Sequence, residues 1–355
     1  MSRQPASGLA GAVLGLAFVF GAAVPASAQN AVTAQTITQE QCGDLKANPI
    51  AWVSACTQII DGGKVLGLEL AKAYAHRGHA YTMLRNLQRA NEDLDNAIKL
   101  DPKSHIAYIN RANLFNVTNK PDRAMADANR AVELAPNIPH PYFVRGGAAM
   151  KLKNYDLAIL DYSEVLRTRP NFAQVYGLRG LAYHSKGDDE RAVTDYSERL
   201  NREPDVGTFL NRGDARRNLK DYPGATEDYS EAIRLAPTNA GGWKGRGFIR
   251  MMMQDFKGSV ADFDQAIKLD PSEAGVYMNR GSALAMIGEK ELALADYDMA
   301  IKLEPGHPIH HVSRAMLLNE MGKRADAIAG LKKALAIMPN FPPALEQLKK
   351  IEAKS

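Results

Sequence analysis

The hydrophobic pattern of the chain is clearest between residues 173 and 204, where apolar and small residues follow two stripes with helical spacing. The members of the two stripes, each spaced i, i+4, i+7, are Tyr176, Gly180 and Tyr183, then Ala192, Tyr196 and Arg199. Residues at this spacing lie on one face of an α-helix. Gly187 separates the stripes and favours the left-handed conformation that ends a helix, and Pro204 ends the second stripe. The pattern therefore predicts two short helices that fold back on each other, and each such unit needs a neighbour to bury its stripes.

This unit recurs along most of the chain. The prolines that close successive units are 34 residues apart, with one interval of 33, and they are Pro102, Pro136, Pro170, Pro204, Pro237, Pro271, Pro305 and Pro339. The period, together with the aromatic-x3-Gly-x2-aromatic and Ala-x3-aromatic spacings, resembles the tetratricopeptide repeat (TPR) family. The resemblance implies an all-α fold, an α-solenoid of eight helix-turn-helix repeats over residues 71–341.

In the TPR family, one side of each first helix lines a concave groove that binds extended peptides or partner helices. If each unit is numbered from the residue three before its first aromatic, positions 2, 5, 6, 9, 12 and 13 fall on that side. The resemblance thus gives as candidate partner-binding residues Asn110, Phe143, Met150, Asn211, Phe248, Met251, Met252, Met278, Asn279, Met286 and Met316, with Ile309 and Val312 on the same side. Flexible methionines suit an adaptable apolar surface, and the alternative is that they pack between neighbouring helices. The lysine and asparagine set that clamps carboxylates in some TPR proteins is incomplete, because Phe248 replaces a required asparagine.

One charged pattern departs from the usual family sequence. The residue before the small residue of the first stripe is arginine in every repeat: Arg77, Arg111, Arg145, Arg179, Arg212, Arg246, Arg280 and Arg314. Sixteen residues later an aspartate follows in seven repeats: Asp93, Asp127, Asp161, Asp195, Asp228, Asp262 and Asp296. Evenly repeated charges indicate a structural ladder, because an active site is local. In the eighth repeat Gly330 stands in place of the acid.

Seven acids for seven junctions between repeats predict that each aspartate pairs with the arginine of the following repeat. By this scheme Asp161 meets Arg179 and Asp262 meets Arg280. The first arginine, Arg77, would face the segment before the repeats, near Ser54.

The amino-terminal segment resembles an export signal. The first 28 residues carry one charged side chain, Arg3, and an apolar run over residues 9–24, followed by Ala-Ser-Ala at residues 26–28. This pattern is typical of a signal peptide, here cleaved after residue 28. The alternative is an uncleaved membrane anchor, although the run is short for a span and broken by glycine. We therefore expect a disordered tail over residues 29–36 and a periplasmic or secreted protein without stable membrane insertion after cleavage.

Cys42 and Cys56 are the only cysteines of the chain. In an exported protein an isolated pair predicts a disulfide, which for a loop of this length stabilises the fold by about 3 kcal/mol. Cys42 is expected on a short helix and Cys56 on a helix over residues 50–60. We interpret residues 37–70 as an amino-terminal cap held by this bridge, similar to exported bacterial TPR proteins, and residues 342–355 as a carboxy-terminal capping helix.

Few motifs indicate catalysis or a cofactor. The sequence has no phosphate-binding Gly-Lys-Ser/Thr loop, no nucleophile elbow and no paired-histidine metalloprotease motif. His307, His310 and His311 are close in sequence, and we expect exposed loop histidines there in preference to a metal site. His76 and His79 are expected at the surface as well. The net charge of +4 is mild and interspersed, which disfavours a nucleic-acid partner.

These observations predict a non-enzymatic, cofactor-free scaffold that binds a protein or peptide in the groove of a TPR array. The alternative is a structural component of an envelope assembly that self-associates. A monomer in size-exclusion chromatography would disfavour that alternative.

Overall fold

The computed structural model describes residues 42–43 and 48–353. Within these residues the regular elements are helices, and no strand is present. The helices are α2 (Pro49–Asp61), α3 (Gly67–Met83), α4 (Leu87–Leu100), α5 (His105–Val117), α6 (Pro121–Leu134), α7 (Pro139–Lys151), α8 (Tyr155–Thr168), α9 (Ala173–Lys186), α10 (Asp189–Arg202), α11 (Val206–Asn218), α12 (Tyr222–Leu235), α13 (Ala240–Met252), α14 (Phe256–Leu269), α15 (Ala274–Met286), α16 (Lys290–Leu303), α17 (Pro308–Glu320), α18 (Arg324–Ile337) and α19 (Pro342–Glu352). The predicted signal peptide and tail lie outside the described residues.

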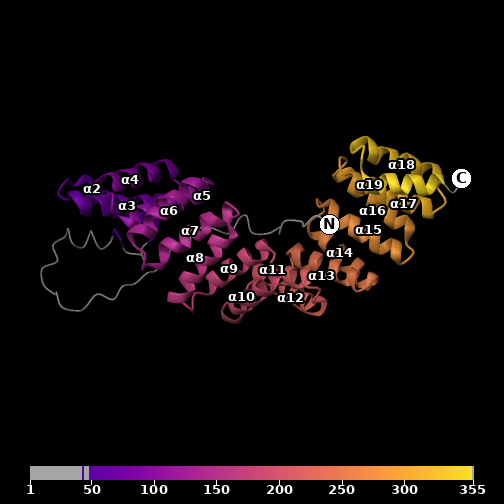
Figure 1. Cartoon of the computed structure of the whole chain (residues 1–355), viewed down its shortest axis with the longest axis horizontal. Helices are drawn as coiled ribbons and strands as arrows, with labels where there is room; N and C mark the ends of the chain where they lie inside the picture. The colour runs from indigo at the N-terminus through magenta and orange to yellow at the C-terminus, as the bar shows by residue number, and fades with distance from the viewer. Residues whose placement is uncertain (1–41, 44–47, 354–355) are drawn as a thin grey trace. The chain divides into compact units, whose positions relative to one another are not determined.

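The helices follow the hairpin order that the 34-residue period predicts (Figure 1). Successive helices pack as pairs across a short turn, for example α3 with α4, α7 with α8 and α13 with α14, and second helices such as α8 also pack on the next first helix. The chain forms two compact units, unit 1 up to Asp195 and unit 2 from Tyr196. The predicted all-α repeat fold is confirmed in both units.

A small residue on each first helix lets the second helix come close. A methyl group at Gly146 would lie 2.7 Å from a ring carbon of Tyr162, and one at Gly281 would lie 2.9 Å from the Tyr297 ring. Side-chain carbons do not approach so closely, and this explains why glycine occupies these positions. The tyrosine of the second helix is buried as a result, with Tyr162 only 1% exposed.

The first aromatic of a repeat also fixes the loop before it. Tyr142 donates its hydroxyl to the carbonyl oxygen of Pro136 at 3.0 Å, and the Trp243 indole donates to that of Pro237 at 2.9 Å. The proline ends the preceding helix, and the bond from the aromatic side chain satisfies its carbonyl. The aromatic and proline landmarks of the sequence are therefore partners across the junction between repeats.

The turn between the two helices of a repeat has the same left-handed backbone in all eight repeats. The residues with positive φ at this turn are Arg85, Asn119, Lys153, Gly187, Lys220, Gln254, Gly288 and Gly322. At Gly187 φ is 91°, which confirms the helix end predicted there. The turn thus recurs where glycine is absent, because the packing of the two helices imposes it.

Helices outside the repeats pack on both ends of the array. α2 packs against α3, and α19 packs against α17 and α18. Within α19, Ile351 is buried and Leu348 half-buried against a cluster that includes Leu331, whereas Leu345 is exposed. Among the described helices, none has both the length and the apolar composition needed to cross a membrane.

Candidate functional site

The arginines and aspartates form a ladder, but its geometry differs from the predicted one. Asp161 accepts two hydrogen bonds from Arg145 of its own repeat, at 2.9 and 2.7 Å, and Asp262 accepts two from Arg246, at 2.9 and 2.8 Å. The predicted pairing of Asp161 with Arg179 and of Asp262 with the next repeat is therefore wrong. The two helices of a repeat pack face to face, so residues sixteen positions apart meet within the pair.

From Arg111 onward, each ladder arginine nevertheless reaches the preceding repeat through another residue. The second contacts lie two positions after the preceding repeat's aspartate and are Asp95 with Arg111, Asn129 with Arg145, Ser163 with Arg179, Ser197 with Arg212, Ser230 with Arg246, Asp264 with Arg280 and Asp298 with Arg314. A residue two positions further along a helix lies on roughly the opposite face, which here is the face toward the next repeat. The guanidinium thus links three helices.

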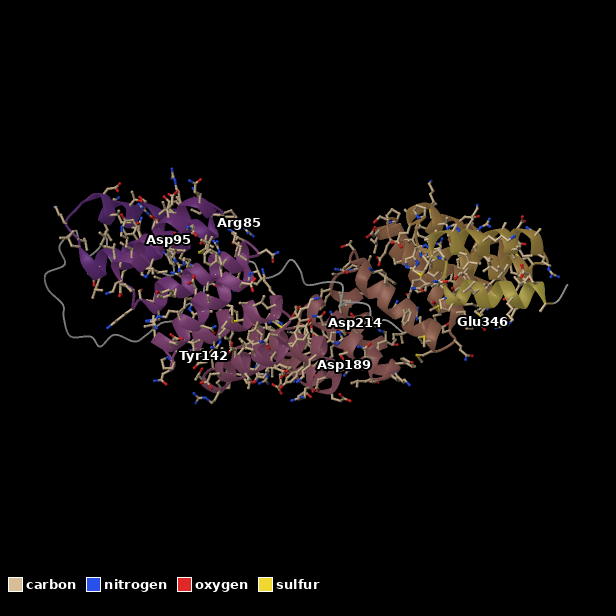
Figure 2. The ribbon with its side chains drawn as sticks, turned by 45° about the horizontal axis from the view of Figure 1, so that its top comes forward. Arg85, Asp95, Tyr142, Asp189, Asp214 and Glu346 are labelled. Atoms are coloured by element: carbon tan, nitrogen blue, oxygen red, sulfur yellow. A yellow bond between two sulfur atoms is a disulfide. The ribbon has the colours of Figure 1, made fainter. Side chains whose placement is uncertain are left out.

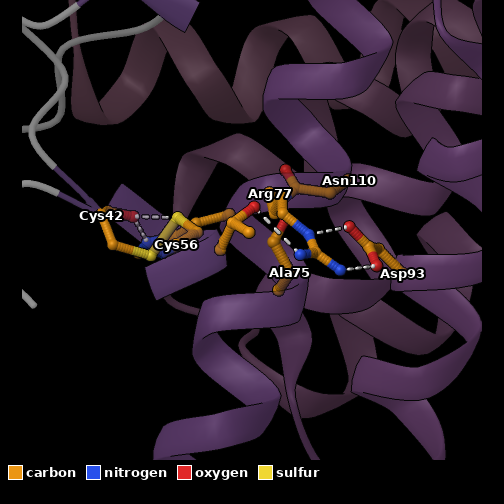
Figure 3. The surroundings of a disulfide bond; sticks show 8 residues. Cys42, Cys56, Ala75, Arg77, Asp93 and Asn110 are labelled. Atoms are coloured by element: carbon orange, nitrogen blue, oxygen red, sulfur yellow. Dashed lines mark hydrogen bonds and ion pairs between the residues drawn. A yellow bond between two sulfur atoms is a disulfide. The ribbon is translucent and has the colours of Figure 1, made fainter. Parts of the chain in front are cut away.

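We call each arginine–aspartate pair a rung of the ladder. At the amino-terminal end the first rung lies beside the disulfide (Figure 3). Arg77 pairs with Asp93 at 2.7 and 2.9 Å and donates to the Thr57 hydroxyl in α2 at 3.1 Å. The prediction that Arg77 faces the segment before the repeats is confirmed, although its partner is Thr57 and not Ser54.

Burial sets the electrostatics of a rung. The Asp161 side chain is 2% exposed and that of Arg145 is 18% exposed. Hydrogen bonding to Asp161 raises the pKa of the Arg145 guanidinium. Burial raises the pKa of the Asp161 carboxyl even though Arg145 acts in the opposite direction. The desolvation cost of the carboxylate is therefore not fully offset by its partner, as is common for buried ion pairs.

The candidate groove residues of unit 1 are engaged within the fold. Asn110 is buried and donates its amide to the carbonyl oxygen of Ala75 in the preceding repeat at 3.1 Å. Phe143 is half-buried, and its ring stacks on Phe172 with centroids 6.1 Å apart. Met150 is half-buried, and both Met150 and Phe143 pack against a core cluster that includes Tyr162. Their prediction as partner contacts is not tested by this packing.

The candidate groove residues of unit 2 divide into a half-buried and an exposed set. The half-buried residues are Asn211, Phe248, Met251, Met278, Asn279 and Ile309, and Val312 is fully buried. Three methionines are exposed, Met252 by 47%, Met286 by 65% and Met316 by 41%. They come from α13, α15 and α17, the first helices of three successive repeats in unit 2. We call Met252, Met286 and Met316 the methionine face.

The predicted disulfide is present, with the Cα atoms of Cys42 and Cys56 4.8 Å apart and both side chains buried. Cys56 lies in α2 as expected, whereas Cys42 lies in a turn and not on a helix. The turn is held by His76, whose Nδ1 donates to the Cys42 carbonyl oxygen at 2.6 Å. Sequence reasoning missed this contact, since nothing in a helical pattern indicates a bond to a residue 34 positions away.

The expectation of surface histidines is wrong at several positions. Burial lowers the pKa of His79 to about 4 and also lowers that of His76. His310 is buried in α17 and stacks on the His307 ring, with centroids 4.6 Å apart. Within the described residues no group of three or more histidine, cysteine or carboxylate side chains is arranged to hold a metal ion.

Comparison with known proteins gives one family. A sequence profile described as tetratricopeptide repeat matches residues 70–139, 143–205 and 250–308, more than half of the chain. No curated protein is similar enough in sequence to count as a relative.

Solved structures with TPR folds are similar as well. The C-terminal part of a TPR repeat-containing protein from Cytophaga hutchinsonii is 20% identical, with a TM-score of 0.56 over 68% of this chain and 99% of that chain. A tetratricopeptide repeat protein from Parabacteroides merdae is 19% identical, with a TM-score of 0.52 over 66% and 93%. A chain of the APC/C hetero-tetramer Cut9–Hcn1 is 15% identical, with a TM-score of 0.51 over 90% and 86%. At these identities the likeness concerns the fold alone.

Proposed function

Because the chain belongs to the tetratricopeptide repeat family, we propose that it is a non-enzymatic scaffold that binds a protein or peptide partner. Proteins of this family generally serve as interaction scaffolds. In this chain the repeated charged side chains form structural pairs along the array, as Arg145 and Asp161 do. The proposal therefore rests on the surface that the repeats leave open.

The methionine face is the observation that carries the proposal. Met252, Met286 and Met316 expose flexible thioether side chains on three successive first helices. Such side chains adapt their shape to apolar residues of a partner, so they suit a segment of a protein that presents an apolar stripe. Half-buried Phe248 and Met278 border this surface in our proposal, and Asn211 and Asn279 supply hydrogen bonds beside it.

In unit 1 we propose a smaller contribution from Asn110, Phe143 and Met150. The Asn110 amide nitrogen already has a partner within the fold, and the Phe143 ring is stacked. We therefore expect these residues to shape the groove, while the main apolar contact is made by unit 2.

The test replaces Met252, Met286 and Met316 together by glutamate. Exposed positions accept a charge, so the helical content in circular dichroism should stay unchanged while the variant no longer captures the partners that the unchanged protein retains from envelope extracts. Leu292→Glu is the matched control, because Leu292 is 56% exposed on a second helix of the same unit. Equal capture by the triple variant would refute the methionine face. Size-exclusion chromatography of the unchanged protein and of the triple variant tests the self-association alternative, which a monomer in both cases would disfavour.

We also propose that the protein is exported to the periplasm or secreted. A buried disulfide is typical of oxidising compartments, and the sequence Ala-Ser-Ala at residues 26–28 follows an apolar run. Mass spectrometry of protein from fractionated cells should find a chain that begins at Gln29 outside the cytoplasm. A membrane-bound chain that begins at Met1 would contradict cleavage and support the anchor.

A further inference from the structure

A cleft of about 300 Å³ in unit 1 is lined by residues of α4, α5 and α6. Its charged and aromatic lining consists of Asp95 from α4 (Figure 2), Arg111 and Phe115 from α5, and Arg123 and Asp127 from α6. None of these lining residues is a candidate groove residue, although Arg111 follows Asn110 on α5. The proposed function does not use it.

The carboxylates of the cleft already have donors. Asp127 accepts from Arg111 Nε at 2.7 Å and from Nη2 at 2.8 Å. One oxygen of Asp95 accepts from Arg111 Nη1 at 2.7 Å, and the other accepts from the Asn91 amide at 2.8 Å. Each of the four carboxylate oxygens therefore has a hydrogen bond, and Arg111 is held between two acids.

Arg123 is the exception in this lining. It is exposed, and its guanidinium carbon lies 5.8 Å from the centre of the Phe115 ring, which Arg111 approaches at 5.9 Å. Among the described residues, no carboxylate forms an ion pair with Arg123. The guanidinium is planar, so its N–H donors match a planar acceptor such as a carboxylate. The carboxylates of the cleft are engaged, whereas the exposed Arg123 guanidinium can exchange its water for an incoming acceptor.

The same arrangement occurs one repeat earlier. Arg89, 34 residues before Arg123, lies over the Tyr81 ring at 5.8 Å, and it too is exposed without an ion pair in the described part of the chain. In the third repeat the corresponding residues are Ala149 and Leu157, which lack it. In the fourth repeat Arg191 lies over the Tyr183 ring at 4.5 Å, but there the arginine pairs with Asp188. Arg89 and Arg123 are therefore two arginines of adjacent repeats that lie over aromatic rings and have no carboxylate partner among residues 42–43 and 48–353.

We propose that Arg89 and Arg123 form a docking site for an acidic segment of a partner protein, with one partner carboxylate bound in the cleft at Arg123 and a second at Arg89. A carboxylate matches the guanidinium fork and gives charge-assisted hydrogen bonds. The two arginines and two aspartates of the cleft sum to zero charge, so binding there depends on direct contacts with the guanidinium groups and not on a broad positive field.

The experiment measures fluorescence anisotropy of a labelled decaglutamate peptide with the full chain at low ionic strength, where exposed charges are least screened. An extended peptide of this length spans roughly 30 Å, enough to reach arginines of adjacent repeats. Arg89→Gln with Arg123→Gln should weaken binding by about five- to tenfold, because two charge-assisted contacts are lost. Both arginines are exposed and form no ion pair in the described residues, so circular dichroism should not change.

The matched control is Arg130→Gln with Arg167→Gln, which removes the same two charges from exposed positions of α6 and α8 in unit 1, where Arg130 pairs with Glu133 and Arg167 pairs with Glu164. This variant should bind the peptide within about twofold of the unchanged protein. An equal loss in the control and in the double variant would overturn the site, and so would absence of binding by the unchanged protein. Tighter binding of decalysine, or of an oligothymidylate of equal charge, would also overturn it in favour of a cation or nucleic-acid surface.

Discussion

Asp161→Asn tests what one rung of the ladder contributes to folding. The carboxylate is 2% exposed and holds the Arg145 guanidinium through bonds of 2.9 and 2.7 Å. Asparagine keeps the size of the side chain and one acceptor oxygen but removes the charge. The variant therefore leaves a largely buried guanidinium without its counter-charge, which is the costly half of a broken ion pair.

The expected loss is about 2–3 kcal/mol. Removal of one partner from a fully buried pair costs about 3–5 kcal/mol, and the 18% exposure of Arg145 and its remaining bond to Asn129 lower this figure. Replacement of both partners, Arg145→Met with Asp161→Leu, should cost about 0–1 kcal/mol, since burial of the carboxylate is not fully compensated in the native pair. The double variant is thus expected to be more stable than the single one.

The assay combines urea denaturation, followed by circular dichroism, with hydrogen exchange of the α7 and α8 amides. Hydrogen exchange is needed because a repeat array can open locally, and one global transition then misses the effect. Glu164→Gln is the control, because its pair with Arg167 is exposed and should contribute less than about 0.5 kcal/mol. A loss below about 0.5 kcal/mol in Asp161→Asn, or a double variant less stable than the single one, would refute the reasoning.

Three further predictions concern backbone, pH and redox state. Gly187→Ala should destabilise by about 1 kcal/mol in urea denaturation because φ is 91°, whereas Gly275→Ala in open space on α15 should be neutral or stabilising by up to about 1 kcal/mol. Burial lowers the pKa of both His79 and His140 to about 4, below the ordinary 6.5. The stability that these neutral rings contribute is present above pH 6.5 and is lost as the pH falls toward 4. The free energy of unfolding should therefore be lower at pH 4.5 than at pH 7 by about 1–3 kcal/mol for each ring, and His79→Gln should reduce this difference. Thiol titration of denatured, non-reduced protein should find no reactive thiol, and reduction should lower the stability of unit 1 by about 2–3 kcal/mol; two thiols per chain would contradict the bridge.

The repeat fold could be predicted from the sequence because its landmarks act locally. Gly187 ends a helix through its own backbone, and a glycine such as Gly146 is needed wherever two helices approach closely. Such requirements recur with the period of the unit and can be counted without knowledge of the neighbours. The aromatic and proline residues belong to the same class, although their direct bond, as in Tyr142 to Pro136, was not predicted.

The exposure of the candidate groove residues could not be predicted in the same way. The phase of a helix gives the direction of a side chain but not the volume of its neighbours. Met278 and Met286 both lie on the predicted side of α15, yet Met278 packs against a core cluster and Met286 is 65% exposed. His79 is a similar case, because its environment includes Trp52 from α2, with ring centroids 5.7 Å apart. Contacts from other helices decide these positions.

The pairing error in the ladder leads to a last prediction, at Gly330. If each aspartate paired with the next repeat, Gly330 in the last repeat would need no acid, because no ninth repeat follows. Pairing within repeats instead leaves Arg314 without an aspartate in its own repeat. Arg314 Nε donates to the Asp298 carboxylate of the preceding repeat at 2.5 Å, and the Arg314 side chain is 30% exposed. Gly330→Asp should supply the missing eighth rung.

The second repeat shows that the aspartate fits. A methyl group at Gly330 would lie 3.2 Å from the Ala315 Cβ atom, and the second repeat accommodates the same alanine–aspartate combination at Ala112 and Asp127. Helix propensity favours the change by a few tenths of a kcal/mol, and a partly buried charge-assisted pair adds about 1 kcal/mol. Gly330→Asn is the control, because asparagine has nearly the size and the helix propensity of aspartate without its charge. Gly330→Asp should therefore exceed it by about 1 kcal/mol in urea denaturation and should slow hydrogen exchange in α17 and α18. If asparagine stabilises the repeat as much as aspartate does, the ladder does not contribute through the charge of its pairs, and the arginines must then act by packing their stems against aromatic rings.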